Sequence, residues 1–584
     1  MDFALVADIF EEMEKTSKRL ELTDYLVELF RKTPADIIDK VVYLIQGKIK
    51  PDYEGVELGV ADKMIIKAIA LSSGLEQSKI EQFYRDAGDI GYAGEEALKQ
   101  RQQMTLFQEK VDVEKVYSIL EKIASLSGEG SQDLKIRYLC NLLNNTTPKE
   151  SRYILRIVAG KLRLGIADYT ILDALSIAFT NSKENRNILE HAYNISSDLG
   201  SVAKLLATKG LDAVKNLKVS IFKPIRPMLA ERVSTPQEAL EKTDGICAAE
   251  YKLDGERVQI HKKNDKIMLF SRRLENITSH YPDAIEAINK YIDKDAIILE
   301  AEIVAIDQNT GEYLPFQELM HRRRKYGIEE AMKEYPVALN FFDILYFDKE
   351  CLDMKYIDRR RLLEDIISEV DNIMRTVPMI ITSDADSIEK FMEQAISEGC
   401  EGLMIKNLNS GYRAGAREYA WIKLKREYRG ELADSLDLVI VGAYYGRGRR
   451  AGKYGAFLLA AYDDQNDMFR SISKIGTGFS DEDLDMFYKI LEQYKLKKKD
   501  PRVDSKLEAD VWFEPKIVIE VIASEITLSP LHTCAMNSIR KDAGLALRFP
   551  KFTGRVRDDK RPEDATTVRE VIDLYNKQKK VVKE

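Results

Sequence analysis

The sequence predicts a multidomain protein: an all-α domain, then an α+β domain, then a small β-barrel with a helical tail. Its 584 residues exceed what a single hydrophobic core organises. The spacing of apolar residues changes from helical to strand-like near residue 219, and short strands with glycine-rich turns dominate after Asp434. We therefore expect domains at residues 1–218, 219–430 and 431–584.

Apolar residues at helical spacing characterise the first region, as in Val113, Val116 and Leu120. Strand-like alternation is scarce there, so we expect only helices. The following segment FKPIRPMLAERV, residues 222–233, contains two prolines and separates this region from one with a period of two. The first domain boundary is therefore expected near residue 219.

Short apolar runs in residues 219–430 are typical of strands, and helical stretches lie between them, which indicates an α+β domain. The later runs VIVGAYYG, AFLLAAY, RSISKIG and KIVIEVIA alternate with glycine-rich turns and predict the barrel. The strands expected in the middle domain are 245–251, 297–305, 337–347, 402–405 and 421–425.

The composition predicts a globular protein that is neither embedded in a membrane nor exported. Hydrophobic residues make up 45% of the chain and charged residues 32%, and no apolar run approaches the roughly 18 residues that span a bilayer. The acidic start lacks the features of a secretory signal. The cysteines form no CxxC pair, which argues against disulfides and structural zinc, so we expect a cytoplasmic protein; they are Cys140, Cys247, Cys351, Cys400 and Cys534.

The net charge of −8 by itself discourages a nucleic-acid interpretation, so local charge has to decide. Residues 444–457, YYGRGRRAGKYGAF, contain Arg447, Arg449, Arg450 and Lys453 and no acidic residue. Basic runs are usually solvated faces. Glycines around this cluster also let the backbone approach a phosphate chain, so its arginines are candidate nucleic-acid contacts.

Lys252 is the candidate nucleophile, because it opens the sequence Lys-Leu-Asp-Gly-Glu-Arg at the end of an expected strand. A lysine amine has a reference pKa of about 10.4, so exposing the free amine near neutral pH costs roughly 4 kcal/mol unless cations or desolvation depress that pKa. A second cation is therefore expected nearby. Strand alternation places Lys423 and Lys425 on one face, opposite Ile422 and Leu424. An amphipathic edge strand with solvated lysines is the alternative.

Seven motifs occur in the order found in one enzyme superfamily: KLDGER, SRR, AEIVA, FFDILYF, EGLMIK, WIKLK and the terminal RFPKFTGRVRDDK. In this order they resemble the motifs of covalent nucleotidyltransferases, which comprise DNA ligases, RNA ligases and mRNA capping enzymes. Nearly the whole chain is similar to ATP-dependent DNA ligases of the archaeal and eukaryotic replicative type. The helical half supports this choice, because residues 153–174 resemble the signature of a DNA-binding domain that RNA ligases and capping enzymes lack.

The resemblance implies an all-α DNA-binding domain, an α+β nucleotidyltransferase (ATP-grasp-like) core and a β-barrel of OB-fold type. It also implies ATP-dependent sealing of nicks in duplex DNA. In that reaction the lysine amine attacks the α-phosphate of ATP, AMP passes to the 5′-phosphate of the nick, and the 3′-hydroxyl displaces AMP. We expect a hinge near residues 425–434 and a monomer whose domains encircle the duplex through backbone contacts.

The resemblance further implies a role for each matching residue. Lys252 would carry AMP, Glu250 would contact adenine, and Phe342 would stack on the base. Glu302 would contact ribose or metal, and Glu401 would help to hold Mg²⁺ (or Mn²⁺). The residues implied to contact ribose, phosphate and pyrophosphate are Arg257, Arg272, Arg417, Lys423, Lys425, Arg548, Lys551, Arg557 and Lys560. Lys161 and Arg163 are candidate DNA-phosphate contacts, with a solvated helix face as the alternative.

The glutamates are also interpretable from the residues alone. Alternation places Glu250 on the Lys252 side of its strand, where a carboxylate or a backbone carbonyl could accept a hydrogen bond from the adenine amino group. Two carboxylates near a polyphosphate, such as Glu302 and Glu401, suit Mg²⁺. The odd offset between Glu401 and Lys406 predicts opposite faces of a regular strand, and which of them faces the pocket stays open.

Three positions depart from the family's usual pattern. Ala301 stands where glycine is usual, Lys551 replaces a common arginine, and Gly554 resembles a one-residue insertion. None of these changes removes a reacting group. The insertion leaves Arg555 and Arg557 interchangeable as candidate phosphate contacts.

A short segment, QMTLF at residues 103–107, resembles the sliding-clamp-binding peptide of related archaeal ligases. Gln103, Leu106 and Phe107 would make the contact with a sliding clamp of the PCNA type. An ordinary helix or loop is the alternative.

Two other functions remain to be weighed. An RNA ligase or capping enzyme would share the motifs but lack the helical half, and a clamp-associated DNA-binding scaffold would have no need to keep KLDGER and WIKLK intact. Use of ADP, GTP or NAD⁺ in place of ATP, and the preferred divalent ion, stay open.

Overall fold

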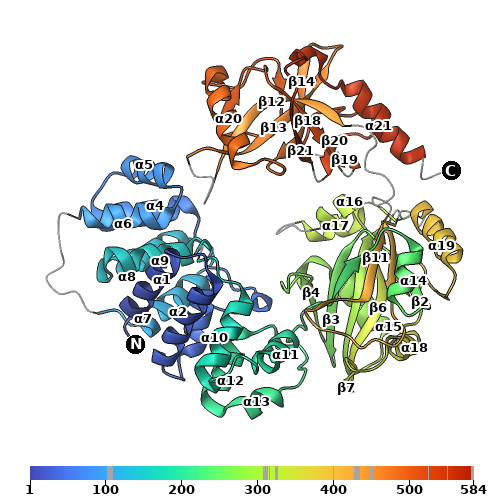
Figure 1. Ribbon diagram of the computed structural model, residues 1–584, viewed down its shortest axis with the longest axis horizontal. Helices are drawn as coiled ribbons and strands as arrows, with labels where there is room; N and C mark the ends of the chain where they lie inside the picture. The colour runs from blue at the N-terminus through green and yellow to red at the C-terminus, as the bar shows by residue number, and fades with distance from the viewer. Residues whose placement is uncertain are drawn as a thin grey trace.

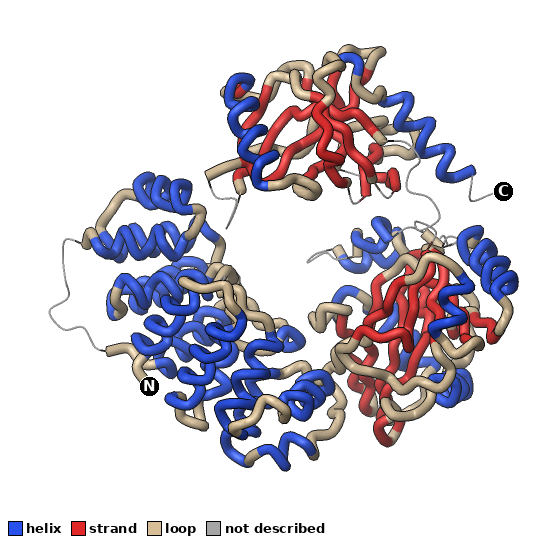
Figure 2. The backbone as a smooth tube through the Cα atoms, in the orientation of Figure 1, coloured by secondary structure: helices blue, strands red, loops and turns tan. Residues whose placement is uncertain are grey.

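The protein consists of three parts that follow one another along the chain and are arranged as an arc around a central opening (Figure 1). Helices alone build the N-terminal part, and strands dominate the other two (Figure 2). The computed structural model describes residues 1–101, 110–162, 164–306, 313–314, 316–322, 327–398, 400–425, 435–446, 452–523, 525–529, 531–548 and 550–580.

The N-terminal part is helical, which confirms the prediction for this region. Its helices bury apolar stripes at the expected spacing; Val113, Val116 and Leu120 are fully buried in α7, whose N-terminus is capped by the Asp112 carboxylate. The helices are α1 (Phe3–Glu14), α2 (Arg19–Lys32), α3 (Ile38–Ile45), η1 (Asp52–Glu54), α4 (Asp62–Ser73), α5 (Gln77–Ala87), α6 (Ile90–Lys99), α7 (Val113–Ser125), α8 (Ser131–Asn145), α9 (Pro148–Val158), α10 (Asp168–Thr180), α11 (Arg186–Ser196), α12 (Leu199–Lys209) and α13 (Leu211–Lys215).

Helix α9 is the most deeply buried of these helices, and it carries two buried arginines. Arg152 pairs with Glu95 of α6 at 2.8 Å, and Arg156 pairs with Asp89 at 3.0 Å and also with Glu14 of α1. The two guanidinium groups can be buried because each of them is paired with carboxylates. Helix α9, in which the segment 153–174 begins, is therefore tied to both α1 and α6.

The middle part packs two sheets against each other. The first sheet has the order β1-β11-β10-β2-β9, and the second has the order β4-β3-β5-β6-β7, with β8 paired to β6. The strands are β1 (Leu229–Arg232), β2 (Cys247–Lys252), β3 (Glu256–Lys263), β4 (Lys266–Ser271), β5 (Ala296–Ala305), β6 (Val337–Phe347), β7 (Lys349–Glu350), β8 (Met374–Thr376), β9 (Met379–Thr382), β10 (Gly402–Lys406) and β11 (Arg417–Lys425).

Helices cover the outer faces of these two sheets. α14 and α19 pack on the first sheet, and α15 and α18 pack on the second, so that each sheet has a core on its outer side. The helices are α14 (Pro236–Lys242), η2 (Thr278–His280), α15 (Pro282–Tyr291), α16 (Phe316–Met320), α17 (Ile328–Glu334), α18 (Tyr356–Ile366) and α19 (Ala385–Ser397). The α+β prediction is confirmed, and β6 has the predicted bounds.

The C-terminal part is a curved sheet built on β12, β13 and β14, with β18 paired to β12 and β21 paired to β18, and a separate two-stranded sheet of β19 and β20. Its strands are β12 (Leu436–Tyr445), β13 (Tyr454–Asp463), β14 (Met468–Ile475), β15 (Lys495–Leu496), β16 (Val503–Asp504), β17 (Val511–Phe513), β18 (Val518–Ile522), β19 (Glu525–Ser529), β20 (Gly544–Arg548) and β21 (Lys551–Val556). Its helices are α20 (Asp481–Leu491), η5 (Glu492–Tyr494), η6 (Pro562–Asp564) and α21 (Val568–Lys580), the last of which is the predicted tail.

The two junctions between the parts differ in character. At the first, Arg226 lies over the Tyr193 ring at 4.5 Å and pairs with Asp168 at 3.4 Å, while its carbonyl accepts from the Gly415 amide at 3.1 Å. At the second, the described residues contribute the ion pairs of Arg540 with Glu318 and of Arg548 with Glu401 and Asp254. A packed junction on one side and a charged one on the other favour the barrel as the part that moves. None of the helices in the described stretches is both long and apolar enough to cross a membrane.

Buried His261 helps to hold the segment between the helical part and the core. Its Nδ1 accepts from the Phe222 amide at 2.9 Å, and its Nε2 lies 2.8 Å from Oε1 of Gln259. The Gln259 side chain in turn accepts from the Ile225 amide and donates to the Ile225 carbonyl. Burial lowers the pKa of His261 to about 3. The native ring therefore stays neutral, with Nε2 as the donor.

His261 is expected to make the core acid-sensitive. An unfolded imidazole titrates near pH 6.5, so this contribution to stability is complete above that pH and is lost as the pH falls toward 3. Between pH 7 and pH 5 the free energy of unfolding should fall about 2 kcal/mol further in the wild type than in His261→Gln. Urea denaturation of both proteins at the two pH values measures this difference. Equal pH dependence in the two proteins would show that the ring is not held neutral.

Candidate active site

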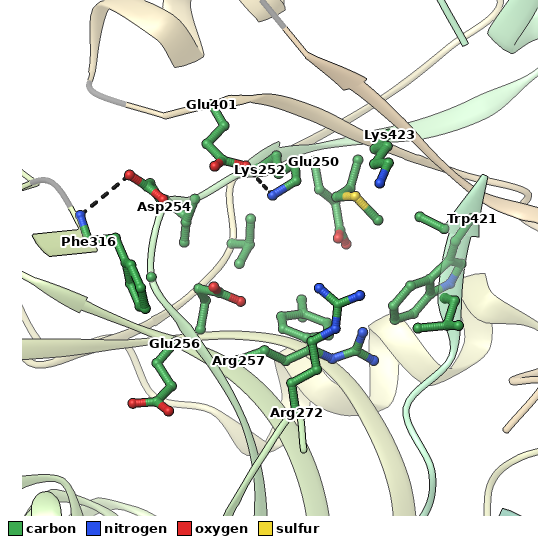
Figure 3. A pocket seen from close by; sticks show the side chains of 18 of the residues that line it. Glu250, Lys252, Asp254, Glu256, Arg257, Arg272, Phe316, Glu401, Trp421 and Lys423 are labelled. Carbon is green, nitrogen blue, oxygen red and sulfur yellow. Dashed lines mark hydrogen bonds and ion pairs between the residues drawn. The ribbon is translucent and has the colours of Figure 1, made fainter. Parts of the chain in front are cut away.

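A cavity of about 580 Å³ lies between the two sheets of the middle part, a volume typical of small-molecule and cofactor sites. The first sheet contributes residues of β2, β10 and β11 to its wall, and the second contributes residues of β3, β4, β5 and β6. Figure 3 shows basic and acidic side chains from both sheets converging on this space. The cavity therefore brings together segments that are up to 320 positions apart, from Met228 to Arg548.

Lys252 is the last residue of β2 and points into the cavity, where its ammonium group pairs with the Glu401 carboxylate (Figure 3). Its side chain remains 23% exposed, so a ligand can reach the amine. A tight turn follows before β3. A Cβ on Gly255 would lie 2.2 Å from the Ile303 carbonyl oxygen, so only glycine lets this turn press against β5.

Both Glu401 and Lys406 face the cavity, which resolves the open question about their orientation. Glu401 precedes the strand, and Gly402 has φ +143°, a left-handed conformation that breaks the regular alternation at this point. Within β10, Met404 and Lys406 share one face of the strand, and this face lines the cavity. Met404 pairs with Glu250 of β2 on one side and with Lys423 of β11 on the other.

One end of the cavity is organised around the buried carboxylate of Glu250. Lys406 pairs with it at 2.6 Å and Arg360 at 3.1 Å, and the Tyr356 hydroxyl donates to it. Burial lowers the pKa of Lys406, and the Glu250 charge acts in the opposite direction. Phe342 lies beside this group, 5.0 Å from the Lys406 ammonium, and gives the same end of the cavity an aromatic wall.

Arginines line the second sheet's side. Arg257 binds both Glu300 oxygens at 2.9 Å, and this carboxylate raises the pKa of Arg257 against the opposing effect of burial. Arg272 points into the same space, and burial, together with the charge of Arg257, lowers its pKa. Among the described residues, Nε of Arg257 and Nε1 of Trp421 are buried donors without a hydrogen-bond partner. The cavity thus offers unused donors and positive charge to an anionic ligand.

Asp254, Glu302 and Glu401 make the region around Lys252 acidic. Burial raises the pKa of Glu302 to about 7, and burial followed by the charge of Glu401 raises the pKa of Asp254 to about 6. Carboxylates that repel one another in this way gain from a bound cation, so the donor set suits a hard divalent ion. In the part of the chain that the structure describes, no three such side chains are grouped closely enough to hold a metal ion alone. Part of the ligand shell would have to be phosphate oxygens and water.

The barrel contributes Arg548 to the cavity wall, 3.4 Å from Glu401 and 3.9 Å from Asp254. The other residues of the terminal motif lie elsewhere. Arg557 and Lys560 bind Asp437 of β12 at 2.8 and 2.7 Å, and Lys551 is exposed on β21. The structure therefore brings one of the four predicted residues of this motif to Lys252.

The remaining candidates fall into two groups. Arg417 and Lys423 line the cavity, and Lys161 pairs with Asp62 at 3.3 Å on the helical part. Several predicted residues lie outside the described residues: Gln103, Leu106 and Phe107 of the clamp segment, Arg163, the side chain of Lys425, and Arg447, Arg449 and Arg450.

Sequence reasoning missed several residues that line the cavity or hold its lining residues in place. Tyr356 and Arg360 lie in α18, whose sequence YIDRRRLLEDI is typical of a solvated charged helix, so nothing in it signals a buried partner for Glu250. Glu300 shares a face with Glu302 in β5, and this alternation was the available signal. Phe316 and Met320 come from α16, a short helix inserted between β5 and β6.

Comparison with known families matches the chain in three successive segments. A family described as DNA ligase N terminus matches residues 2–176. A family described as ATP dependent DNA ligase domain matches residues 227–425, and one described as ATP dependent DNA ligase C terminal region matches residues 450–560. The middle match contains every cavity residue except Arg548, which falls in the last one.

Whole-chain relatives agree with these matches. The sequence is 58% identical to the DNA ligase of Nitrosopumilus maritimus over 582 residues, which cover 100% of this chain and 99% of the relative. It is 49% identical to the DNA ligase of Saccharolobus solfataricus over 592 residues, covering 99% and 98%. Among solved structures, Pmar-Lig_PreS3 has the same fold, with a TM-score of 0.56 at 18% identity over 94% of this chain and 99% of that one.

Proposed function

We propose, from the premise that this chain belongs to the family of ATP-dependent DNA ligases, that Lys252 is the residue that carries AMP. Ligases of this family use ATP and seal nicks in duplex DNA through a lysyl-AMP intermediate and an adenylated 5′-phosphate, and this is the reaction of the present chain. The observation that supports the assignment is the Lys252 side chain, which enters the cavity and pairs there with Glu401.

In the first step the Lys252 amine attacks the α-phosphate of ATP. A nitrogen–phosphorus bond forms, the bond between the α-phosphate and its bridging oxygen breaks, and pyrophosphate leaves. The amine must first lose its proton, and Glu401 is the acceptor in contact with it. Arg257 and Arg272 stabilise the charge that develops on the phosphates, because both guanidinium groups face the same space.

The nucleotide base occupies the end of the cavity that Glu250 and Phe342 form. Glu250, fixed by two cations, acts only as an acceptor and so selects the amino group of adenine, while the Phe342 ring packs on the base. Arg417, Lys423 and Lys425 bind phosphates from β11. Pyrophosphate is oriented by four residues of the barrel: Arg548, Lys551, Arg557 and Lys560. Arg548 already lines the cavity, and barrel movement has to bring the other three there.

Glu302 and Glu401 are the residues that would hold Mg²⁺ (or Mn²⁺). A bound divalent ion supplies charge neutralisation to the triphosphate. The raised pKa of Glu302 supports this assignment, since a carboxylate that is costly to ionise alone becomes a good ligand when a cation is present.

Pyrophosphate release and DNA entry follow. The AMP on Lys252 passes to the 5′-phosphate of the nick, and the adjacent 3′-hydroxyl then displaces AMP. For these steps the three parts, with bounds near residues 218 and 430, would close around the duplex, and the barrel would be of OB-fold type. Backbone contacts would come from Lys161, Arg163, Arg447, Arg449 and Arg450. A monomeric state, a cytoplasmic location and a clamp contact through Gln103, Leu106 and Phe107 belong to the same proposal.

Intact-mass spectrometry tests the nucleotide and the nucleophile together. After incubation with ATP and Mg²⁺, the wild type should gain the mass of one AMP, and adding nicked duplex DNA should remove it. The matched Lys252→Ala protein should gain nothing. If protein stripped with pyrophosphate forms no adduct with ATP, or if Lys252→Ala still forms one, the proposed site is wrong.

A further inference from the structure

One ion pair joins the barrel to the core away from the nucleotide cavity. Arg540, in the connection between β19 and β20, pairs with Glu318 of α16. The Glu318 side chain is 8% exposed, whereas that of Arg540 is 45% exposed. A carboxylate so buried depends on its partner, because an unpaired charge there would lack both water and a counter-ion.

The connection that carries Arg540 is rigid. The Leu545 amide donates to the Cys534 carbonyl at 2.7 Å, the Asn537 amide donates to the Ala543 carbonyl at 3.0 Å, and the Asn537 side chain accepts from the Asp542 amide at 2.7 Å. At Gly544, a Cβ would come within 2.1 Å of the His532 carbonyl oxygen. Arg540 is therefore fixed relative to strand β20.

The same strand ends at Arg548, which enters the cavity beside Glu401 and Asp254. Strand β20 thus links two contacts between barrel and core: Arg540 on Glu318 before the strand, and Arg548 over the Lys252 pair at its end. Because the segment between them is held rigid, seating Arg540 determines where Arg548 lies.

The core side of this contact is also connected to the cavity. Phe316 and Met320, at the two ends of α16, line the cavity wall, and the Phe316 amide donates to the Asp254 carboxylate at 3.4 Å (Figure 3). Glu318 lies between them in the same helix. A helix that forms a wall of the nucleotide cavity is therefore the docking point of the barrel.

We infer that the Glu318–Arg540 ion pair is a docking contact that seats strand β20 on the core and so positions Arg548 over Lys252 for self-adenylation. Both residues are positioning residues that act through Arg548. The inference rests on the proposed function, since it assumes that Lys252 accepts AMP. Sealing of a nick that is already adenylated needs no attack by Lys252, so this pair is dispensable for that step.

Charge exchange tests the contact. Arg540→Glu and Glu318→Arg should each slow single-turnover AMP uptake about tenfold, a loss of roughly 1.4 kcal/mol, with little change in the ATP concentration that gives half the maximal rate. The double variant, which restores opposite charges, should regain most of the rate, as should Arg540→Lys. Sealing of a synthetic pre-adenylated nick should stay within about twofold of wild type for all of them.

Arg502→Ala is the matched control, because Arg502 pairs with Asp467 and Glu563 inside the barrel. It should leave both steps unchanged. Equal losses in AMP uptake and in sealing, or no recovery in both the double variant and Arg540→Lys, would overturn the inference. Absence of any AMP adduct on the wild-type protein would instead overturn the proposed function, so the two failures are distinguishable. Melting temperatures identify a variant that fails to fold. If Glu318→Arg or the double variant fails to fold, the comparison of AMP uptake by Arg540→Glu and by Arg540→Lys decides whether the ion pair is needed.

Discussion

Replacing Lys252 by arginine is expected to abolish nick sealing from ATP while sparing the sealing of a pre-adenylated nick. Arginine keeps the positive charge and can still pair with Glu401, but its guanidinium group stays protonated and cannot attack phosphorus. Losing a covalent nucleophile should lower the overall rate by more than about 10³-fold. The last step uses the 3′-hydroxyl as the nucleophile, so it should stay within about tenfold of wild type.

Quenched-flow assays on two substrates measure this separation. One is a nicked duplex with a 5′-phosphate plus ATP, and the other is the same duplex carrying 5′-adenylate without ATP. Lys263→Arg is the matched control, because Lys263 lies at the exposed far end of β3 and does not line the cavity. If Lys252→Arg seals both substrates poorly to the same extent, Lys252 has a general role in folding or DNA binding. If it seals both well, another group accepts AMP.

The strand and helix pattern was readable from local periodicity wherever one face of an element is buried. Strand β6 has the predicted bounds because its run VALNFFDILYF is apolar at all positions but Asn340 and Asp343 and is followed by the charged residues Asp348 and Lys349. Strand β11 was predicted too short, since the predicted span started at Trp421 while pairing with β1 begins at Arg417. Parallel pairing between segments about 190 positions apart leaves no local signal in Arg417 or Glu418.

The orientation of a candidate residue was predictable where the alternation of its own strand determines it. It was unpredictable where a contact with a distant segment determines it. Alternation correctly placed Glu250 and Lys252 on one face, and it placed Lys423 opposite Ile422 and Leu424. It failed at Glu401, because Gly402 interrupts the alternation with a left-handed φ.

The buried partners of Glu250 could not be predicted for a different reason. Tyr356 and Arg360 approach it from α18, more than a hundred positions away, and the sequence of a charged helix does not show which of its charged side chains are turned inward. For Arg557 and Lys560 the sequence gives the motif but not the conformation. Both residues pair with Asp437 inside the barrel, and whether they can reach the cavity depends on where the barrel stands relative to the core.

Glu250→Ala is expected to destabilise the core more strongly than any other single change at the base end of the cavity. It would leave the Lys406 ammonium and the Arg360 guanidinium buried and without their shared carboxylate. Breaking a buried ion pair in this way costs about 3–5 kcal/mol. Tyr356→Phe removes only one hydrogen bond to the same carboxylate and keeps the ring in place, so its cost should be about 1 kcal/mol. The two variants therefore separate the charge from the hydrogen bond.

The unfolding of the core can be followed in a Trp512→Phe background, because Trp421 in the cavity wall is then the only tryptophan. Glu250→Gln is the matched variant: it keeps the shape and one acceptor oxygen, loses the charge, and should fall between the other two in stability. Its affinity for ATP should drop about tenfold if a fixed acceptor selects the adenine amino group, a change of roughly 1.4 kcal/mol. If Glu250→Ala costs no more than Tyr356→Phe, the two cations must find other partners or water. Glu250 would then not be the fixed acceptor on which the proposed selection of adenine depends.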